Sequence, residues 1–390
     1  MIFFIIICSI ILFYQFTNAA KHKGLFIIFS ISFLLKLILL FLSENSIFTP
    51  TDGGSDAVGF IEESFKIYYS NDFLGYFDTS RLHGYGSYPY FLSILYKLFY
   101  PSHWIILFLN ILFHNSILIT LKKSLDLLNI SNQNKYFLIA ITAFFPLILF
   151  YSVLSIREII YIWYITFMCY NILYLKRKNK LFSSPIIIIS ISIIVSILHI
   201  ANIIILPVAY FLFYKTGKFV KVSFIFLLLI GFFKLLTDAN INLGYTSFLN
   251  TNDESLVLNR INESRMSSSV FYTKYYSNSL VNNITYALPI DYLNFTFRPF
   301  IYPFNNIYKN LFRYPYGLIS LMLFFIVIKN YRKSGKFEKK MLFFFLIVII
   351  PFVIGSGDMF QAVRHRMNYF TLIILLIGLF IQNNKYEKNQ

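Results

Sequence analysis

The stretch KRKNKLFSSPIIIISISIIVSILHIANIIILPVAYFLFYK, Lys176 to Lys215, decides the fold class of this chain. It holds an apolar run of about 30 residues, whereas one helix needs about 20 to cross a bilayer. Basic residues flank the run on both sides, and short loops rich in Lys and Arg stay on the cytoplasmic side of a membrane. We therefore expect a tight hairpin of two short spans, 184–199 and 200–214, that begins and ends on that side.

The composition of the whole chain also indicates a membrane protein. Of its 390 residues, 57% are hydrophobic and only 13% are charged, and the mean hydropathy is +0.66. A soluble core of this length could not bury that much apolar surface. Cys8 and Cys169 lie inside apolar runs, so neither a disulfide framework nor a zinc site is expected from them. Residues 1–20 resemble a signal peptide in ending with small residues, but they lack a basic leader and we expect a retained first span.

The net charge of +17 is confined to a few loops. Six basic segments carry all of it, and the rest of the chain is neutral: 21–23, 122–135, 176–180, 215–221, 329–340 and the tail from Lys385. This alternation of basic and non-basic loops is the positive-inside pattern, and it explains the high pI without a nucleic-acid partner.

If every basic segment is cytoplasmic, an even number of crossings must separate successive ones. Eleven spans satisfy this condition, with the amino terminus outside and the carboxyl terminus in the cytoplasm. The expected limits are 1–19, 24–43, 103–121, 136–152, 157–175, 184–199, 200–214, 222–237, 314–329, 341–355 and 367–382. The sequence thus predicts an all-α, polytopic membrane protein in which residues 1–390 form one transmembrane domain.

Three segments outside the expected spans are more than connectors, at about 44–88, 238–313 and 355–366. The first two are long extracytoplasmic loops, expected to carry interfacial helices, and the first is acidic. Polar groups kept beside a bilayer despite their desolvation cost are frequently functional, so we expect a site in these segments.

Two aspartates stand in TDGGSDAVGF, Thr51 to Phe60. Asp52 precedes two glycines and belongs to a turn. Ser55 or Asp56 is expected to cap an amphipathic helix lying in the outer interface. The apolar positions of that helix are Val58, Ile61, Phe65 and Tyr68. A cap role and a chemical role for Asp56 fit the local pattern equally well, and the two aspartates are a weak signal for Mg²⁺ or Mn²⁺.

Other polar residues lie where expected spans meet the outer side. Arg81 and His83 precede an aromatic segment that can re-enter the interface, although an aromatic belt is the simpler explanation for any one tyrosine. Arg157 and Glu158 open the fifth span. Neighbours on a helix point about 100° apart, so each is expected to find its own partner or reach water, with snorkelling of Arg157 as the alternative.

A cationic group precedes the last span, where Arg364, His365 and Arg366 follow one another. The positive-inside rule does not explain arginines on the outer side, and a guanidinium suits bidentate phosphate binding. Arg298 adds to this set. His199, at the turn of the short hairpin, is more often a packing residue than a ligand, although an ionisable group there stays a functional candidate.

Four stretches taken together resemble the membrane glycosyltransferases of the GT-C superfamily and the related O-antigen and exopolysaccharide polymerases of bacteria. They are GSDAVGFIEES, GYGSYPYFLSILYKLF, SIREIIYIW and RHRMNYFTLIILLIGLF. The resemblance implies a protein of the bacterial cytoplasmic membrane that works on polyprenyl-linked sugars in lipopolysaccharide or other polysaccharide assembly. A glycan acceptor and a chain-length regulator or other assembly protein are the partners it implies. The sequence itself requires no cofactor, with a divalent cation as the one that could bind.

The resemblance also implies roles for individual residues. Asp56, or alternatively Asp52, would be the general base for the acceptor hydroxyl, and Arg157, Arg364 and Arg366 would neutralise the departing phosphate. The choice between a polymerase and a single-sugar transferase stays open. Many O-antigen polymerases have an arginine with a glycine eleven residues after it in an outer loop, and we find no such pair here. A flippase or other transporter is the rival class. It predicts repeated halves and several charges within spans, where only Lys36 and Lys234 stand out.

Overall fold

The computed structural model describes residues 2–44, 54–70, 87–214, 289, 296, 314–354 and 364–386. Within these ranges the chain is helical and contains no strand. In the amino-terminal half the helices are α1 (Ile2–Ala20), α2 (Lys23–Glu44), α3 (Gly54–Tyr69), α4 (Ser87–Leu98), α5 (Trp104–Leu127), α6 (Asn132–Phe144) and α7 (Pro146–Tyr151). Then follow α8 (Glu158–Lys178), α9 (Pro185–Leu198), η2 (Ile200–Ile204), α10 (Ile205–Phe213), α16 (Tyr314–Asn330), η4 (Tyr331–Lys333), α17 (Lys336–Val348), α18 (Ile350–Ile354) and α20 (Phe370–Tyr386).

Four of the described helices, α1, α2, α5 and α8, are long and apolar enough to cross a membrane. The segments 185–198, 202–213 and 370–382 are shorter apolar helices. These helices indicate a membrane protein, as expected. Each expected span contains helix in the structure, except 222–237, which lies outside the described residues. The helix breaks near Ile349 in the expected span 341–355 and at Asn368 and Tyr369 in 367–382. The expected span 136–152 is interrupted at Phe145, whose extended backbone is the conformation that a following proline favours.

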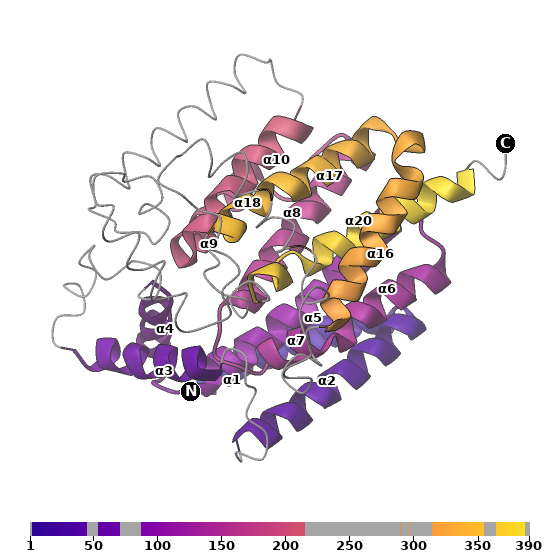
Figure 1. Cartoon of the computed structure of the whole chain (residues 1–390). Helices are drawn as coiled ribbons and strands as arrows, with labels where there is room; N and C mark the ends of the chain where they lie inside the picture. Colours follow the sequence, from indigo (N-terminus) through magenta and orange to yellow (C-terminus); the bar gives the residue numbers. More distant parts are fainter. Residues whose placement is uncertain are drawn as a thin grey trace, which may run out of the picture.

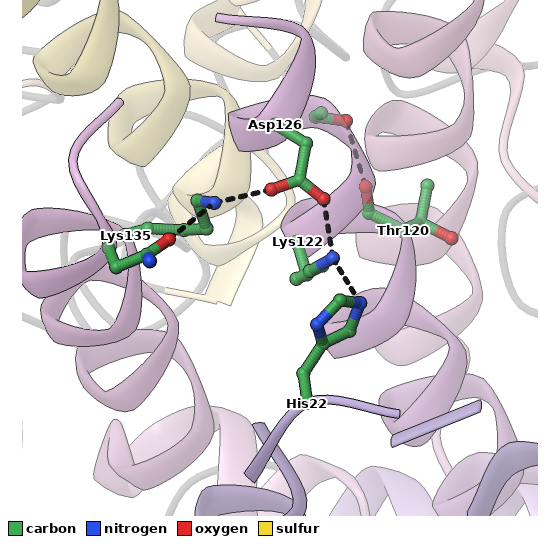
Figure 2. A network of polar contacts seen from close by, with 7 residues as sticks. His22, Thr120, Lys122, Asp126 and Lys135 are labelled. Carbon is green, nitrogen blue, oxygen red and sulfur yellow. Dashed lines mark hydrogen bonds and ion pairs between the residues drawn. The ribbon is translucent and has the colours of Figure 1, made fainter. Parts of the chain in front are cut away.

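The two ends of the bundle gather different residues. In Figure 1, α3 and α4 lie at one end of the bundle, and α20 ends toward the other. The end that we call the basic end is fixed by Asp126 near the end of α5. Its carboxylate lies 2.6 Å from Lys122 Nζ and 2.5 Å from Lys135 Nζ of α6 (Figure 2). Lys122 Nζ is also 2.6 Å from Nε2 of His22, in the turn between α1 and α2. Two basic segments far apart in sequence, 21–23 and 122–135, therefore meet at one end.

Helix α8 ends at the basic end too, because α5 and α8 run side by side in the same direction. The Asn110 amide near the start of α5 donates to the Ile156 carbonyl just before α8 (3.0 Å), and the Phe113 and Trp163 rings pack 5.1 Å apart. At the other end of α8, Lys176 lies 3.6 Å from Glu338 of α17. The clusters 176–180 and 329–340 thus lie at the end where the topology expects them.

The hairpin predicted from the apolar run is present in the structure. The backbone N–H of Ser183, just before α9, donates to the Asn171 side chain of α8 (3.1 Å), near the basic end. His199 follows α9 and lies at the opposite end, 5.6 Å from the Tyr161 ring. Phe213, the last residue of α10, packs 5.6 Å from the Phe337 ring at the basic end. The chain therefore reverses through η2.

Helix α3 confirms the expected amphipathic helix, but its buried face is not the one that the spacing predicted. Val58 is 55% exposed, whereas the buried positions are Ala57, Phe60, Ser64 and Ile67. Apolar residues lie on both sides of this helix, so their spacing alone does not select a face. Tight packing against α4 selects the side where Ala57 and Ser64 are small enough for close approach. Ser55 and Asp56 fall inside the first turn of α3, not before it.

Candidate functional site

The end opposite the basic end gathers polar residues from three separate parts of the chain. Arg157 and Glu158 open α8, His199 follows α9, and residues 364–366 precede α20. Arg364 Nε lies 2.9 Å from Glu158 Oε1. The His199 and His365 rings pack edge to face 5.5 Å apart. We call this group the arginine cluster, made of Arg157, Glu158, His199, Arg364, His365 and Arg366.

The carbonyl of Leu198 organises the cluster. Leu198 is the last residue of α9, so its carbonyl accepts no hydrogen bond from a backbone N–H of that helix. Arg157 Nη1 donates to this oxygen at 3.0 Å, the Tyr161 hydroxyl at 2.9 Å and the Ser87 hydroxyl at 3.4 Å. One carbonyl therefore joins α4, α8 and α9, and it fixes the direction of the Arg157 side chain.

Helices α3 and α4 cover the cluster on one side. The Phe60 ring of α3 lies 5.6 Å from the Arg157 guanidinium carbon, a distance suited to a cation–π contact. Phe60 also packs edge to face on Tyr88 of α4, 5.0 Å away. Asp56 lies one helical turn before Phe60 on α3. The element that carries the expected base therefore packs directly against an expected phosphate-binding arginine.

The cluster is withdrawn from solvent. Arg157 is 5% exposed, Glu158 2% and Arg366 0%. Burial, together with nearby Arg364 and Arg157, holds the pKa of His365 well below its usual range, so this ring is neutral at physiological pH. Burial and then the Glu158 carboxylate raise the pKa of the Tyr88 phenol. The site therefore combines fixed cations with neutral donors.

Two polar atoms beside the cluster remain available for another molecule. Glu158 Oε2 and the Tyr88 hydroxyl are both buried, and neither has a hydrogen-bond partner among the described residues. A buried polar atom without a partner costs free energy, which a bound hydroxyl group or water would recover. The carboxylate oxygen can accept a hydrogen bond and the phenol can donate one, and a hydroxyl group or a water molecule suits either atom.

The sequence analysis found much of this cluster. Arg157 and Glu158 do take separate partners, as expected from their helical geometry, but the alternative of a snorkelling Arg157 is wrong because its side chain is buried. Arg364, His365 and Arg366 lie where predicted, before the last helix. Asp52, Arg81, His83 and Arg298 lie outside the described residues, as does the side chain of Asp56.

Other residues of the site were missed or undervalued. His199, which we weighed first as a packing residue and second as a functional candidate, stacks on the Phe352 ring at 5.0 Å and packs edge to face on His365. Its position at the hairpin turn was a usable signal, because that turn must lie at the end opposite the basic loops. Tyr88 and Tyr161 carried no signal, since tyrosine is abundant throughout the chain.

No group of three or more His, Cys, Asp or Glu side chains suited to a metal ion comes together within the described ranges. The expectation of a divalent cation at Asp52 and Asp56 stays a prediction, because it falls on side chains outside those ranges.

A second buried polar group lies between α2 and α5. Lys36 is fully buried, and its Nζ donates to Asn115 Oδ1 at 2.6 Å. His114 and Asn110 of α5 are fully buried as well. Asn110 also donates to the Leu154 carbonyl at 2.6 Å, in the loop that leads to Arg157. Polar side chains therefore continue from the cluster into the apolar part of the bundle.

No protein-family model matches this chain, and neither a curated protein nor a solved structure matches it.

Proposed function

We propose that this protein is an integral-membrane glycosyltransferase. It takes a sugar, or a repeat unit, from a polyprenyl phosphate or diphosphate donor at the outer face of the bacterial cytoplasmic membrane and transfers it to a glycan in cell-surface polysaccharide assembly. The arginine cluster is the observation that carries this proposal. It brings three arginines, two of them buried, from two distant segments to one end of the bundle, beside a carboxylate and a helix that contains Asp56.

The chemistry of glycosyl transfer accounts for these groups. A base removes the proton of the acceptor hydroxyl, the new bond forms between that oxygen and the anomeric carbon, and the bond to phosphate breaks with its electron pair on the leaving oxygen. Asp56 would keep the proton, while Arg157, Arg364 and Arg366 would stabilise the departing phosphate. One direct displacement of this kind inverts the anomeric centre. Burial of the cluster limits competing hydrolysis.

The proposed orientation follows from the basic end. Because Lys122, Lys135 and Lys176 lie together at that end, we assign it to the cytoplasm and the arginine cluster to the outer face. Eleven crossings, with the amino terminus outside, remain our topology. A donor on a polyprenyl chain can then reach the cluster from within the bilayer, with its phosphate at the depth of the arginines.

The decisive experiment is the pattern of lipid-linked glycans in a strain that lacks the gene. A complete single repeat unit accumulates if the protein is a polymerase, and a truncated unit if it adds one sugar. In the deletion strain complemented with Asp56→Asn, the protein should insert normally, but the lipid-linked glycans should stay those of the deletion strain. Glu63→Gln is the matched control, because this residue lies on the same helix in an exposed pair with Lys66. Full glycan yield with Asp56→Asn would falsify the assignment of the base.

One observation favours a flippase or other transporter as the second candidate. Lys36 is an ionisable side chain buried in a helix long enough to span a membrane, and such groups frequently serve substrate or ion pathways. This function predicts full-length lipid-linked units trapped on the cytoplasmic side of the deletion strain. It also predicts that Lys36→Met abolishes glycan export while Arg364→Met does not.

A further inference from the structure

The basic end carries a surface that the proposed transferase reaction does not use. It consists of Lys176, Arg177, Lys178 and Lys180 after α8 with Arg332, Lys333, Lys336, Lys339 and Lys340 around η4 and α17, and we call it the α8–α17 patch. Eight of these nine side chains are exposed, and Lys339 is half-buried. The only carboxylate within these two stretches is Glu338, so the patch has a formal charge of +8.

Specific contacts hold the two halves of the patch together. Lys176 Nζ lies 3.6 Å from Glu338 Oε1 and 3.9 Å from the centre of the Phe337 ring. The Lys340 ammonium donates to the Leu212 carbonyl at 2.8 Å, which joins α10 to the same surface. Two basic stretches far apart in the chain thus form one cationic surface. Repulsion between their like charges opposes this arrangement, and the contacts above offset it.

An apolar wall begins directly beside this surface. Phe182 packs on the Tyr170 and Tyr174 rings of α8 at 4.8 Å and 5.5 Å, yet it is half exposed. From there α9 runs away from the basic end, and its outward residues are exposed isoleucines, beginning with Ile186 at 75%. They are Ile186, Ile187, Ile189, Ile193, Ile194 and Ile197.

We propose that the α8–α17 patch binds the headgroups of acidic phospholipids, with their acyl chains along the isoleucine wall of α9. Charge complementarity decides the headgroup, because clustered Lys and Arg at a membrane surface attract anionic lipids. The apolar wall argues against a soluble polyanion, because a nucleic acid or an acidic peptide would not cover the exposed isoleucines of α9. This site lies at the opposite end of the bundle from the arginine cluster, so it is independent of the proposed reaction.

Fluorescence quenching in vesicles tests the proposal. Phe182→Trp places a reporter beside the patch, in vesicles that mix phosphatidylglycerol and phosphatidylcholine with bromine on the acyl chains of one lipid at a time. We expect stronger quenching by brominated phosphatidylglycerol, and we expect added salt to remove the difference because ions screen the headgroup charge. The unmodified chain is the control, since Trp104 and Trp163, its two tryptophans, lie in the half of the bundle away from the patch.

Charge neutralisation makes the test residue-specific. In the chain that carries Phe182→Trp, the triple change Lys176→Gln, Arg177→Gln and Lys178→Gln should lower the lipid preference by up to about fivefold for each cation removed. The matched control is Lys21→Gln, Lys23→Gln and Lys123→Gln, which removes the same charge from exposed residues elsewhere at the basic end. It should leave the lipid preference of the tryptophan reporter unchanged.

Three results would overturn the proposal. The first is equal quenching by the two brominated lipids at low salt. The second is an equal loss of preference in the two triple variants. The third is displacement of phosphatidylglycerol by a small mole fraction of polyprenyl phosphate, which would make the patch a substrate site. If a triple variant fails to insert, the variant with Phe182→Trp alone still tests the proposal. Its quenching either favours brominated phosphatidylglycerol and loses that preference in salt, as we expect, or is equal for the two lipids at low salt.

Discussion

Arg364 Nε lies 2.9 Å from Glu158 Oε1, and this pair joins the first residue of α8 to the segment before α20. The second carboxylate oxygen of Glu158 has no partner among the described residues. The pair therefore holds a carboxylate in place while leaving one of its oxygens for a ligand. In the proposed function, the arginine cluster is a preorganised site whose cations would already be positioned before the donor phosphate binds.

Loss of either member of this pair should destabilise the protein. Arg364→Met leaves the buried Glu158 carboxylate without its cation, and we expect a loss of about 3 kcal/mol. Glu158→Gln should cost less, because Arg364 is partly exposed. The double variant should lose less than the sum, because it removes both charges. Thermal unfolding in detergent measures all three. Additive losses in this double-mutant cycle would contradict the coupling.

The Leu198 carbonyl allows a matched pair of tyrosine variants. Tyr161 donates to this carbonyl at 2.9 Å, whereas Tyr164, also buried on α8, donates to Ser192 at 2.8 Å away from the cluster. Changing either to Phe should cost about 1 kcal/mol of stability. We expect only Tyr161→Phe to reduce glycan yield in complemented cells, because it releases the carbonyl that also orients Arg157. Equal yields from the two variants would remove Tyr161 from the site.

His365 gives the protein a dependence of stability on acidic pH. Burial and the neighbouring arginines hold its pKa well below its usual range, while in the unfolded chain the value is about 6.5. As pH falls below about 6.5, the unfolded state gains the proton first, so stability decreases from there down to the folded pKa. His365→Gln should flatten this decrease in melting temperatures recorded from about pH 8 to about pH 5. Parallel curves for the two proteins would show that another group is responsible.

Asp126 should be the key residue of the basic end. Asp126→Asn removes the carboxylate shared by Lys122 and Lys135, whose side chains are only 11% and 10% exposed. We expect a loss of about 1–3 kcal/mol, because two largely buried ammonium groups lose their counter-charge. Glu63→Gln, in the exposed pair with Lys66, should change stability by less than about 1 kcal/mol. Similar unfolding temperatures for the two variants would contradict a structural role for Asp126.

The proposed orientation is testable with single cysteines in a chain whose Cys8 and Cys169 have been replaced by alanine. Tyr69→Cys, at the exposed end of α3, should react with a membrane-impermeant maleimide in intact cells. Lys180→Cys, at the basic end, should react only after the membrane is opened. The reverse pattern would place the arginine cluster in the cytoplasm and exclude our topology.

The sequence supports accurate predictions wherever the physics depends on one residue at a time. Transfer of each apolar side chain into lipid is favourable independently of its neighbours, so the limits of most helices could be predicted from the hydrophobic runs. The lysines of the basic end could be predicted for the same reason, because each charged side chain is excluded from lipid independently of its neighbours. The same reasoning holds in part for residues 364–366, where arginines on the outer side conflicted with the usual charge bias.

Pairings between segments could not be predicted in this way. Most helices here are apolar on every side, so periodicity does not indicate which face of α8 meets the segment before α20 or which face of α3 meets α4. The partner of Glu158, the place of His199 beside His365, and the shift of the α3 contact from Val58 to Ala57 and Phe60 are consequences of packing.

The sequence by itself determined a helical membrane protein, the hairpin between two basic clusters and a set of candidate polar residues, because the desolvation of charged and apolar groups acts locally. Only the tertiary structure decided that Arg157, Glu158, His199 and Arg364 belong to one site, and that Lys176 and Glu338 belong to one surface. These contacts depend on how the helices are rotated and packed against one another, which is a property of the whole bundle and not of any single segment.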